Sequence, residues 1–160
     1  MGEVRTRKVP VYDVLAYGAI PGDSVNDCTE IQAAITAAVN DGGGDVLLSK
    51  VGTYNLNTAN CLTISGEIRI LAVGGRGSFF EANTVTLNYS PTTGTAITVS
   101  AGTATLAGIE LIGFNLVGAG GLNAADGILL NKGTGQILHT KLIGMRVGSF
   151  DSCLQQGTAS

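Results

Sequence analysis

The apolar positions near the start of the chain follow a helical period. They fall at i, i+3, i+4, i+7 and i+8, occupied by Ile31, Ala34, Ile35, Ala38 and Val39, and this spacing places side chains on one face of an α-helix. Asp27 stands before this stripe and Glu30 follows three residues later, which fits a capping box. Asn40 and the glycines after it end the pattern. We predict one helix at about residues 28–40, capped by Asp27 and Glu30 and buried along Ile31 and Ile35.

The rest of the chain contains short apolar runs separated by Gly, Asn and Ser. Examples are DVLLS, GTYNLN, CLTIS, EIRILAV and TVTLNYS, and such runs are typical of short strands. No second helical pattern is visible. Hydrophobic residues make up 44% of the 160 residues, aromatic residues only 5%, and there are 24 glycines. This composition favours many tightly turned strands around an interior of small and branched side chains.

A sequence repeat organises the last third of the chain. Residues 96–116 match residues 127–147 at an offset of 31, with Leu111-Ile112-Gly113 repeated as Leu142-Ile143-Gly144. A further copy begins at Asp151, which echoes Asp126 at an offset of 25. The difference indicates a basic unit of about 25 residues that holds three short strands, and an insertion at Gly118–Ala124.

Units of this kind bury their apolar faces only by stacking on one another. We therefore predict an all-β fold, a right-handed single-stranded parallel β-helix of about 25-residue coils. The helix at about 28–40 covers the open end of the first coil. Residues 1–16 are expected to form an N-terminal arm, and residues 17–160 the N-terminal part of the β-helix domain. The C-terminal coil is expected to be incomplete, so that the natural chain is longer or a partner chain covers it.

Charge and cysteine content narrow the possible partners. The net charge is −3 and no basic patch is present, so we expect no nucleic-acid partner. No apolar run reaches transmembrane length, so no membrane association is expected. Cys28, Cys61 and Cys153 are odd in number and lack metal-binding spacing, which predicts buried free thiols. No cofactor or metal is expected, because Asp41 and Asp45 beside the glycine run are too few for a calcium site.

Five residues are candidates for binding a substrate. His139 and Lys141 are two residues apart and are expected on one face of a strand. Asp126 and Asp151 head successive repeats, where they either cap turns or line a shallow sugar groove together with Arg146. For each, a structural role is the simpler interpretation: His139 as an outward strand residue, and Lys141 in a cross-strand ion pair with Glu110, which occupies the equivalent position one repeat earlier.

The segment from Tyr17 to Leu56 carries a family resemblance. It keeps Tyr17-Gly18-Ala19, Gly22-Asp23, Asp27, Thr29, Ile31-Gln32-Ala33-Ala34-Ile35, Gly42-Gly43-Gly44 and Gly52-Thr53-Tyr54. This pattern resembles the N-terminal cap of the pectate-lyase-like superfamily, in the branch related to polygalacturonases and phage tailspikes. Ala16 and Cys28 replace acidic residues of that pattern, and Ser49-Lys50-Val51-Gly52 replaces its proline-bearing turn.

The resemblance implies proteins that bind or cleave polysaccharides on a lateral face. Glycoside hydrolysis needs a pair of carboxyl groups at a defined separation, and the polygalacturonase signatures Asn-Thr-Asp, Gly-His-Gly and Arg-Ile-Lys do not occur. We therefore predict no catalytic residues here, and leave open whether the complete molecule is an enzyme.

The resemblance, together with the lack of recognisable catalytic residues, leaves three possible functions. The first is the start of a virion tailspike or fibre that recognises a bacterial surface polysaccharide, and degrades it if the complete molecule is catalytic. The second is a truncated polysaccharide lyase or glycoside hydrolase secreted by a bacterium, and the third a purely structural connector. The first implies a virion location and a homotrimer.

Overall fold

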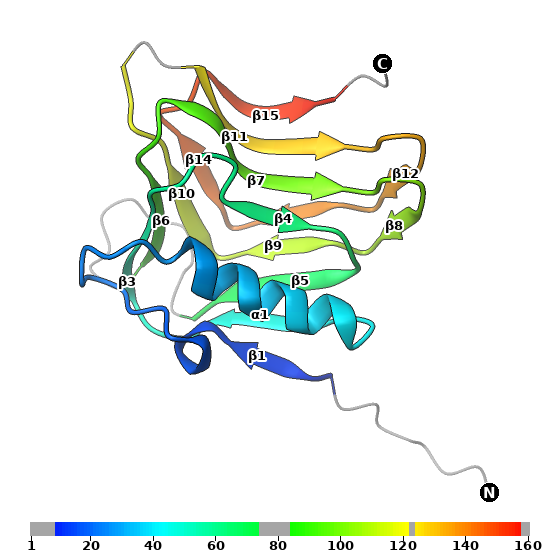
Figure 1. The fold of residues 1–160 in the computed structure, drawn as a ribbon, viewed down its shortest axis with the longest axis horizontal. Coiled ribbons are helices and arrows are strands. Elements are labelled where there is room, and N and C mark those ends of the chain that lie inside the picture. The colour runs from blue at the N-terminus through cyan, green and yellow to red at the C-terminus, as the bar shows by residue number, and fades with distance from the viewer. Residues whose placement is uncertain (1–8, 74–83, 122–123, 158–160) are drawn as a thin grey trace, which may run out of the picture.

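The computed structural model describes residues 9–73, 84–121 and 124–157 of the chain. Within these ranges the protein is mostly β, with parallel strands in four sheets and one α-helix (Figure 1). The expected all-β class is therefore confirmed. Residues 1–8 of the expected arm lie outside the described ranges.

Three sheets carry most of the strands. Sheet A is ordered β1 (Val11–Asp13), β2 (Gly44–Leu48), β5 (Ile68–Ala72), β9 (Glu110–Ile112) and β13 (Lys141–Ile143). Sheet B is ordered β3 (Gly52–Leu56), β6 (Val85–Tyr89), β10 (Phe114–Val117) and β14 (Arg146–Gly148). Sheet C is ordered β4 (Leu62–Ile64), β7 (Thr93–Ser100), β11 (Ala124–Asn131) and β15 (Ser152–Gln156). A fourth sheet, D, pairs β8 (Thr105–Ala107) with β12 (Gln136–Leu138).

The chain visits these sheets in a fixed order. From β2 onward, successive strands belong to sheets A, B and C in turn, and the later passes insert a strand of sheet D between C and A. Each strand therefore pairs with its equivalent from the neighbouring pass, so that strands far apart in the sequence lie side by side (Figure 1).

The predicted repeat sets the strand register. At the offset of 31, Ile128 pairs with Ile97, Ile137 with Leu106, and Leu142 with Leu111. The unit differs from expectation because four strands, not three, make up the later passes. The apolar run after Glu110 divides into β9 and β10 at Gly113, whose φ of 80° is accessible to glycine at little cost and turns the chain from sheet A to sheet B.

Inward-facing side chains form columns through the stack. In sheet A, Val46, Ile70 and Leu111 occupy successive strands and are at most 1% exposed. The next residue in that column, Leu142, is 41% exposed, and Leu154 of sheet C is 54% exposed. The interior is therefore sealed at the end near the helix and uncovered at the end formed by β13, β14 and β15.

Helix α1 (Cys28–Asn40) is found where the sequence predicts it. It packs against β4, β1 and β2, and in Figure 1 it lies below β4, continuing the row of sheet C strands. The chain reaches it after β1, a short 3-10 helix (Val14–Tyr17) and a bridge between Asn26 and Asn55 of β3. The helix thus occupies the position that a sheet C strand would hold in the first pass, and it buries Ile31 and Ile35 against the core.

Gln32 replaces the missing strand neighbour of β4. Its side-chain amide accepts from the Thr63 N–H at 2.7 Å and donates to the Thr63 carbonyl at 3.1 Å. A side-chain amide has the same donor and acceptor pair as a peptide group, so one residue of the helix satisfies both backbone groups that Thr63 presents at the sheet edge.

The predicted capping box is not formed. Asp27 precedes the helix, but its side chain makes no capping hydrogen bond. Its buried carboxylate instead accepts from the backbone N–H of Ile20 at 3.0 Å and of Asn55 at 2.7 Å. Burial raises the pKa of the Asp27 carboxyl. The side chain of Glu30 leaves its buried Oε2 without a hydrogen-bond partner. Asp27 therefore ties the entry loop to β3 and does not cap α1.

We expect Gln32→Glu to destabilise the protein by about 1–2 kcal/mol, because the carboxylate cannot donate to the Thr63 carbonyl and repels it. The free energy of unfolding measured by urea denaturation at neutral pH tests this. Ala33→Glu, on the exposed side of the same helix, is the matched control and is expected to change stability far less. Equal stability of the two variants would contradict the role assigned to Gln32.

Candidate functional site

The five candidate residues are spread over different parts of the surface. Lys141 begins β13 in sheet A, Arg146 begins β14 in sheet B, and Asp126 lies in β11 of sheet C. Asp151 directly precedes β15, and its N–H donates to the carbonyl of Ala125 at 3.0 Å, which places it beside the Asp126 strand. The five do not form one cluster, so the structure divides them into separate regions.

Two of the expected placements are wrong. His139 is not on a strand face: it is an exposed residue between β12 and β13 with a left-handed φ of 55°. It therefore does not share a strand face with Lys141.

Asp126 lies inside β11 and pairs with Ser152 at an offset of 26, not with Asp151 at 25. The structure aligns Leu154 with Ile128, so that both side chains face inward, although Leu154 is 54% exposed at the open end. The register suggested by the aspartates would have turned Leu154 outward.

The outer face of sheet A carries a ladder of charges of alternating sign. Asp45, Arg69, Glu110 and Lys141 are neighbours in the strand register, in that order. Arg69 forms two hydrogen bonds to Asp45, from Nε at 2.7 Å and from Nη2 at 2.6 Å. Lys141 Nζ lies 2.8 Å from Glu110 Oε1. The predicted Glu110–Lys141 ion pair is confirmed, and it lowers the pKa of Glu110.

The aspartates considered for calcium have other partners. Asp45 is occupied by Arg69, and Asp41 accepts a hydrogen bond from the Tyr12 hydroxyl at 2.5 Å. This bond raises the pKa of Tyr12 to about 12. Within the described residues, no group of three or more His, Cys, Asp and Glu side chains could hold a metal ion.

The outer face of sheet B is polar, and the sequence interpretation did not identify it. Thr53, Thr86, Asn115 and Arg146 form one outward column in register, and Asn55 and Asn88 form a second beside it. Hydroxyl, amide and guanidinium groups are the donors and acceptors that neutral and acidic sugars require. The signal in the sequence is the alternation of polar with buried apolar residues in GTYNL and VTLNY.

Arg146 also borders a hollow at the open end of the stack. The hollow has a volume of about 290 Å³ and is lined by Leu116, Val117, Arg146, Val147, Gly148 and Ser149. Of the five candidate residues, Arg146 alone lines it. Its position links the polar face of sheet B to a partly apolar depression, a combination that suits one face of a sugar ring.

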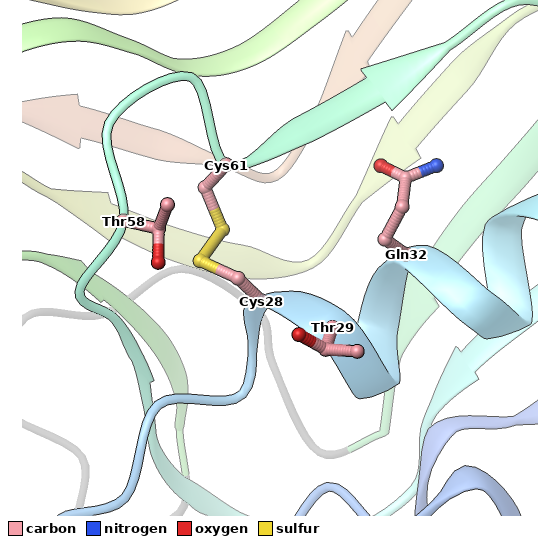
Figure 2. Close-up of a pocket in the computed structure, with 5 residues that line it drawn as sticks. All are labelled: Cys28, Thr29, Gln32, Thr58 and Cys61. Carbon is pink, nitrogen blue, oxygen red and sulfur yellow. A yellow bond between two sulfur atoms is a disulfide. The ribbon is translucent and has the colours of Figure 1, made fainter.

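A second hollow, also about 290 Å³, lies between α1 and β4 and contains a disulfide. Figure 2 shows Cys28 at the start of the helix joined to Cys61, which directly precedes β4, with Thr58 on the same loop. The expectation of free thiols is therefore wrong for these two residues. Cys153 is free, but it is exposed and not buried. An odd cysteine count cannot reveal which two residues meet, because the 33-residue separation is closed by the fold.

In the part of the chain that the structure describes, no helix is both long and apolar enough to cross a membrane. Comparison of the chain with protein-family models, with curated proteins and with solved structures found no match.

Replacing both Cys28 and Cys61 by Ser is expected to lower the free energy of unfolding by about 3–4 kcal/mol, because the crosslink closes a loop of 33 residues. Denaturation with and without a reducing agent tests this. Cys153→Ser is the control, and its stability should match the unsubstituted protein. A double variant as stable as that control would show that the bond adds nothing.

We expect Lys141→Met to raise the pKa of Glu110 toward its ordinary value of 4.5. Because the folded-state pKa is lowered, the ion pair stabilises the fold above the unfolded-state pKa, and this contribution disappears as the pH falls through the folded-state pKa. Carboxyl-carbon NMR titration measures the shift. Lys132→Met, on an exposed turn, should leave the Glu110 pKa unchanged, and a Glu110 pKa that is insensitive to Lys141→Met would contradict the assignment.

Proposed function

We propose that the chain is the capped first part of a right-handed parallel β-helix of the pectate-lyase-like type, and that it belongs to a tailspike or fibre recognising a bacterial surface polysaccharide. The observation that carries this proposal is the repeated succession of sheets A, B and C, beginning at a helix that fills one strand position. Stacked coils of this kind present long, regular lateral faces, on which extended polymers bind.

The polar face of sheet B is the proposed polysaccharide contact. Its columns repeat at the strand spacing of about 4.8 Å, close to the length of one sugar residue. The strands β3 and β6 present the same Thr–Asn pair, and β10 and β14 continue the first column with Asn115 and Arg146. Asn115 is nearly buried in the middle of the face at 8% exposure, and Thr53 and Arg146 are exposed at the two ends of its column. Arg146 supplies the charge for an acidic sugar.

Binding without cleavage is favoured for these residues. Asp45 and Glu110 are held in ion pairs with Arg69 and Lys141, and the polar face of sheet B has no carboxylate in its two columns. A glycosidase needs one carboxyl as an acid and another as a base or nucleophile across the substrate. A lyase or hydrolase activity of a complete molecule would therefore depend on residues outside this face.

The disulfide supports a location outside the reducing cytosol. Structural disulfides persist in secreted proteins and on virion surfaces, and are rare in the cytosol. The Cys28–Cys61 bond is consistent with both proposed locations, a virion tail and the extracellular space of a bacterium.

A structural connector is the second candidate, and the open end favours it. Leu142 and Leu154 are inward residues that are 41% and 54% exposed. Among the described residues, the strands β13, β14 and β15 each have one side without a partner strand. A further coil, from the same chain or from a partner chain, would cover both the side chains and the strand edges.

A panel of bacterial capsular polysaccharides and lipopolysaccharides tests the proposal by calorimetry. We expect binding to at least one, weakened about tenfold by Arg146→Ala, which removes one charged hydrogen bond. Lys132→Ala is the control cation and should bind normally. Failure to bind any polysaccharide would contradict glycan recognition and favour the connector, and release of reducing or unsaturated ends would favour the enzyme.

A further inference from the structure

An apolar stripe runs along the outer face of sheet A. Leu47, Leu71, Ile112 and Ile143 are neighbours in register on β2, β5, β9 and β13. Val46, Ile70 and Leu111, which lie between the stripe and the charge ladder, point inward and are buried. Leu142 continues this column on β13 and is 41% exposed. Leu47, Leu71 and Ile112 are only partly buried and do not pack on the core cluster, and Ile143 is 45% exposed. Four branched side chains in a row on an outer sheet face mark an interaction surface.

The charge ladder runs parallel to this stripe, two residues earlier in each strand. Along the stack its signs read negative, positive, negative, positive, from Asp45 through Arg69 and Glu110 to Lys141. The basic side chains are the more accessible members, with Arg69 at 41% and Lys141 at 58%, against 12% for Asp45 and 18% for Glu110. The face therefore combines an apolar row with a row of charges. When this row of charges is read in the opposite direction along the stack, each position carries the opposite sign.

That pattern complements itself under one symmetry. Consider two copies facing each other about a two-fold axis that lies between them, parallel to the strands and midway between β5 and β9. Stripe then lies on stripe, with Leu71 opposite Ile112 of the second copy. Ladder lies on ladder, with Asp45 opposite Lys141 and Arg69 opposite Glu110. Every charge then lies opposite a charge of the other sign. This arrangement favours association in this register and disfavours registers that bring like charges together.

Other registers lose this complementarity. An axis placed on β5 sets Arg69 against its own copy and Asp45 against Glu110, and an axis placed on β9 sets Arg69 against Lys141. Like charges facing one another are unfavourable. With a two-fold axis along the stack, as in a parallel dimer, strand direction is reversed. The ladder of one copy then faces either the apolar stripe of the other or the same charges of the other ladder.

We propose that the outer face of sheet A binds a second copy of this chain in an antiparallel arrangement, through the apolar stripe and the charge ladder. The face spans about 14 Å from β2 to β13 at the usual strand spacing, which is too small to bury the roughly 800 Å² per partner of a standard stable interface. The dimer is therefore weak and forms at high micromolar concentration. The inference is independent of glycan recognition, and it differs from the expected homotrimer in the direction of the partner.

Sedimentation equilibrium from micromolar to millimolar concentration tests the surface, using Cys153→Ser to prevent disulfide exchange. We expect a concentration-dependent dimer that weakens as salt is raised. Combining Leu71→Lys with Ile112→Lys should reduce association at least tenfold, while Thr86→Lys on sheet B should not. A protein that stays monomeric throughout, or a stripe variant that still dimerises, for example through the open end, would overturn the proposal.

Chemical crosslinking tests the direction. In the Cys153→Ser background, Leu47→Cys and Ile143→Cys are prepared separately and treated with a short bismaleimide. Because Leu47 of one copy lies opposite Ile143 of the other, we expect crosslinked dimers only when the two variants are mixed. Efficient crosslinking of Leu47→Cys with itself would establish a parallel arrangement and refute the antiparallel one. Thr86→Cys, on the sheet B face, is the control that reports random collisions.

Discussion

Parallel strands stacked pass upon pass must end somewhere, and at that end both backbone hydrogen bonds and apolar columns lose their neighbours. The contact between α1 and β4 resolves this at one end of the protein. The Gln32 amide supplies the donor and acceptor that a further strand would have offered to Thr63, and the Cys28–Cys61 bond fixes the helix at the start of the same strand. The buried carboxylate of Asp27 holds the entry loop on β3 in the same way, through backbone N–H groups. The first pass is thus closed by side chains that take over backbone roles.

Beyond the helix, the arrangement of inward and outward side chains follows from the register in which the strands pair. Once β2, β5 and β9 align, their inward residues form a sealed column and their outward residues form rows of one chemical kind. Sheet A presents charge and aliphatic rows, and sheet B presents hydroxyl and amide rows. The outer faces therefore differ in what they can bind, although the same stacking builds both.

The sequence predicted the features that depend on local period or repetition. The helix at 28–40, the strand register at an offset of 31 and the Glu110–Lys141 pair were all accessible in this way. It did not predict the disulfide, because Cys28 and Cys61 meet only after the first pass closes. The capping box failed because Asn55, brought close by the fold, competes for the Asp27 carboxylate. His139 was misplaced because a left-handed residue inside an apolar run leaves no signal in the pattern. The polar columns of sheet B could not be predicted from the sequence, because the strands that form them are separated by unequal numbers of residues.

The unequal ends of the stack have a consequence for how the molecule comes apart. In the part of the chain that the structure describes, each pass pairs only with the passes next to it, so we expect unfolding to proceed inward from whichever end is weaker. The disulfide links the first pass to the second, while β15 contacts only β11 within its sheet and exposes Leu154. We therefore expect loss of structure to begin at β15 and to travel toward the helix, so that the passes joined by the disulfide open last.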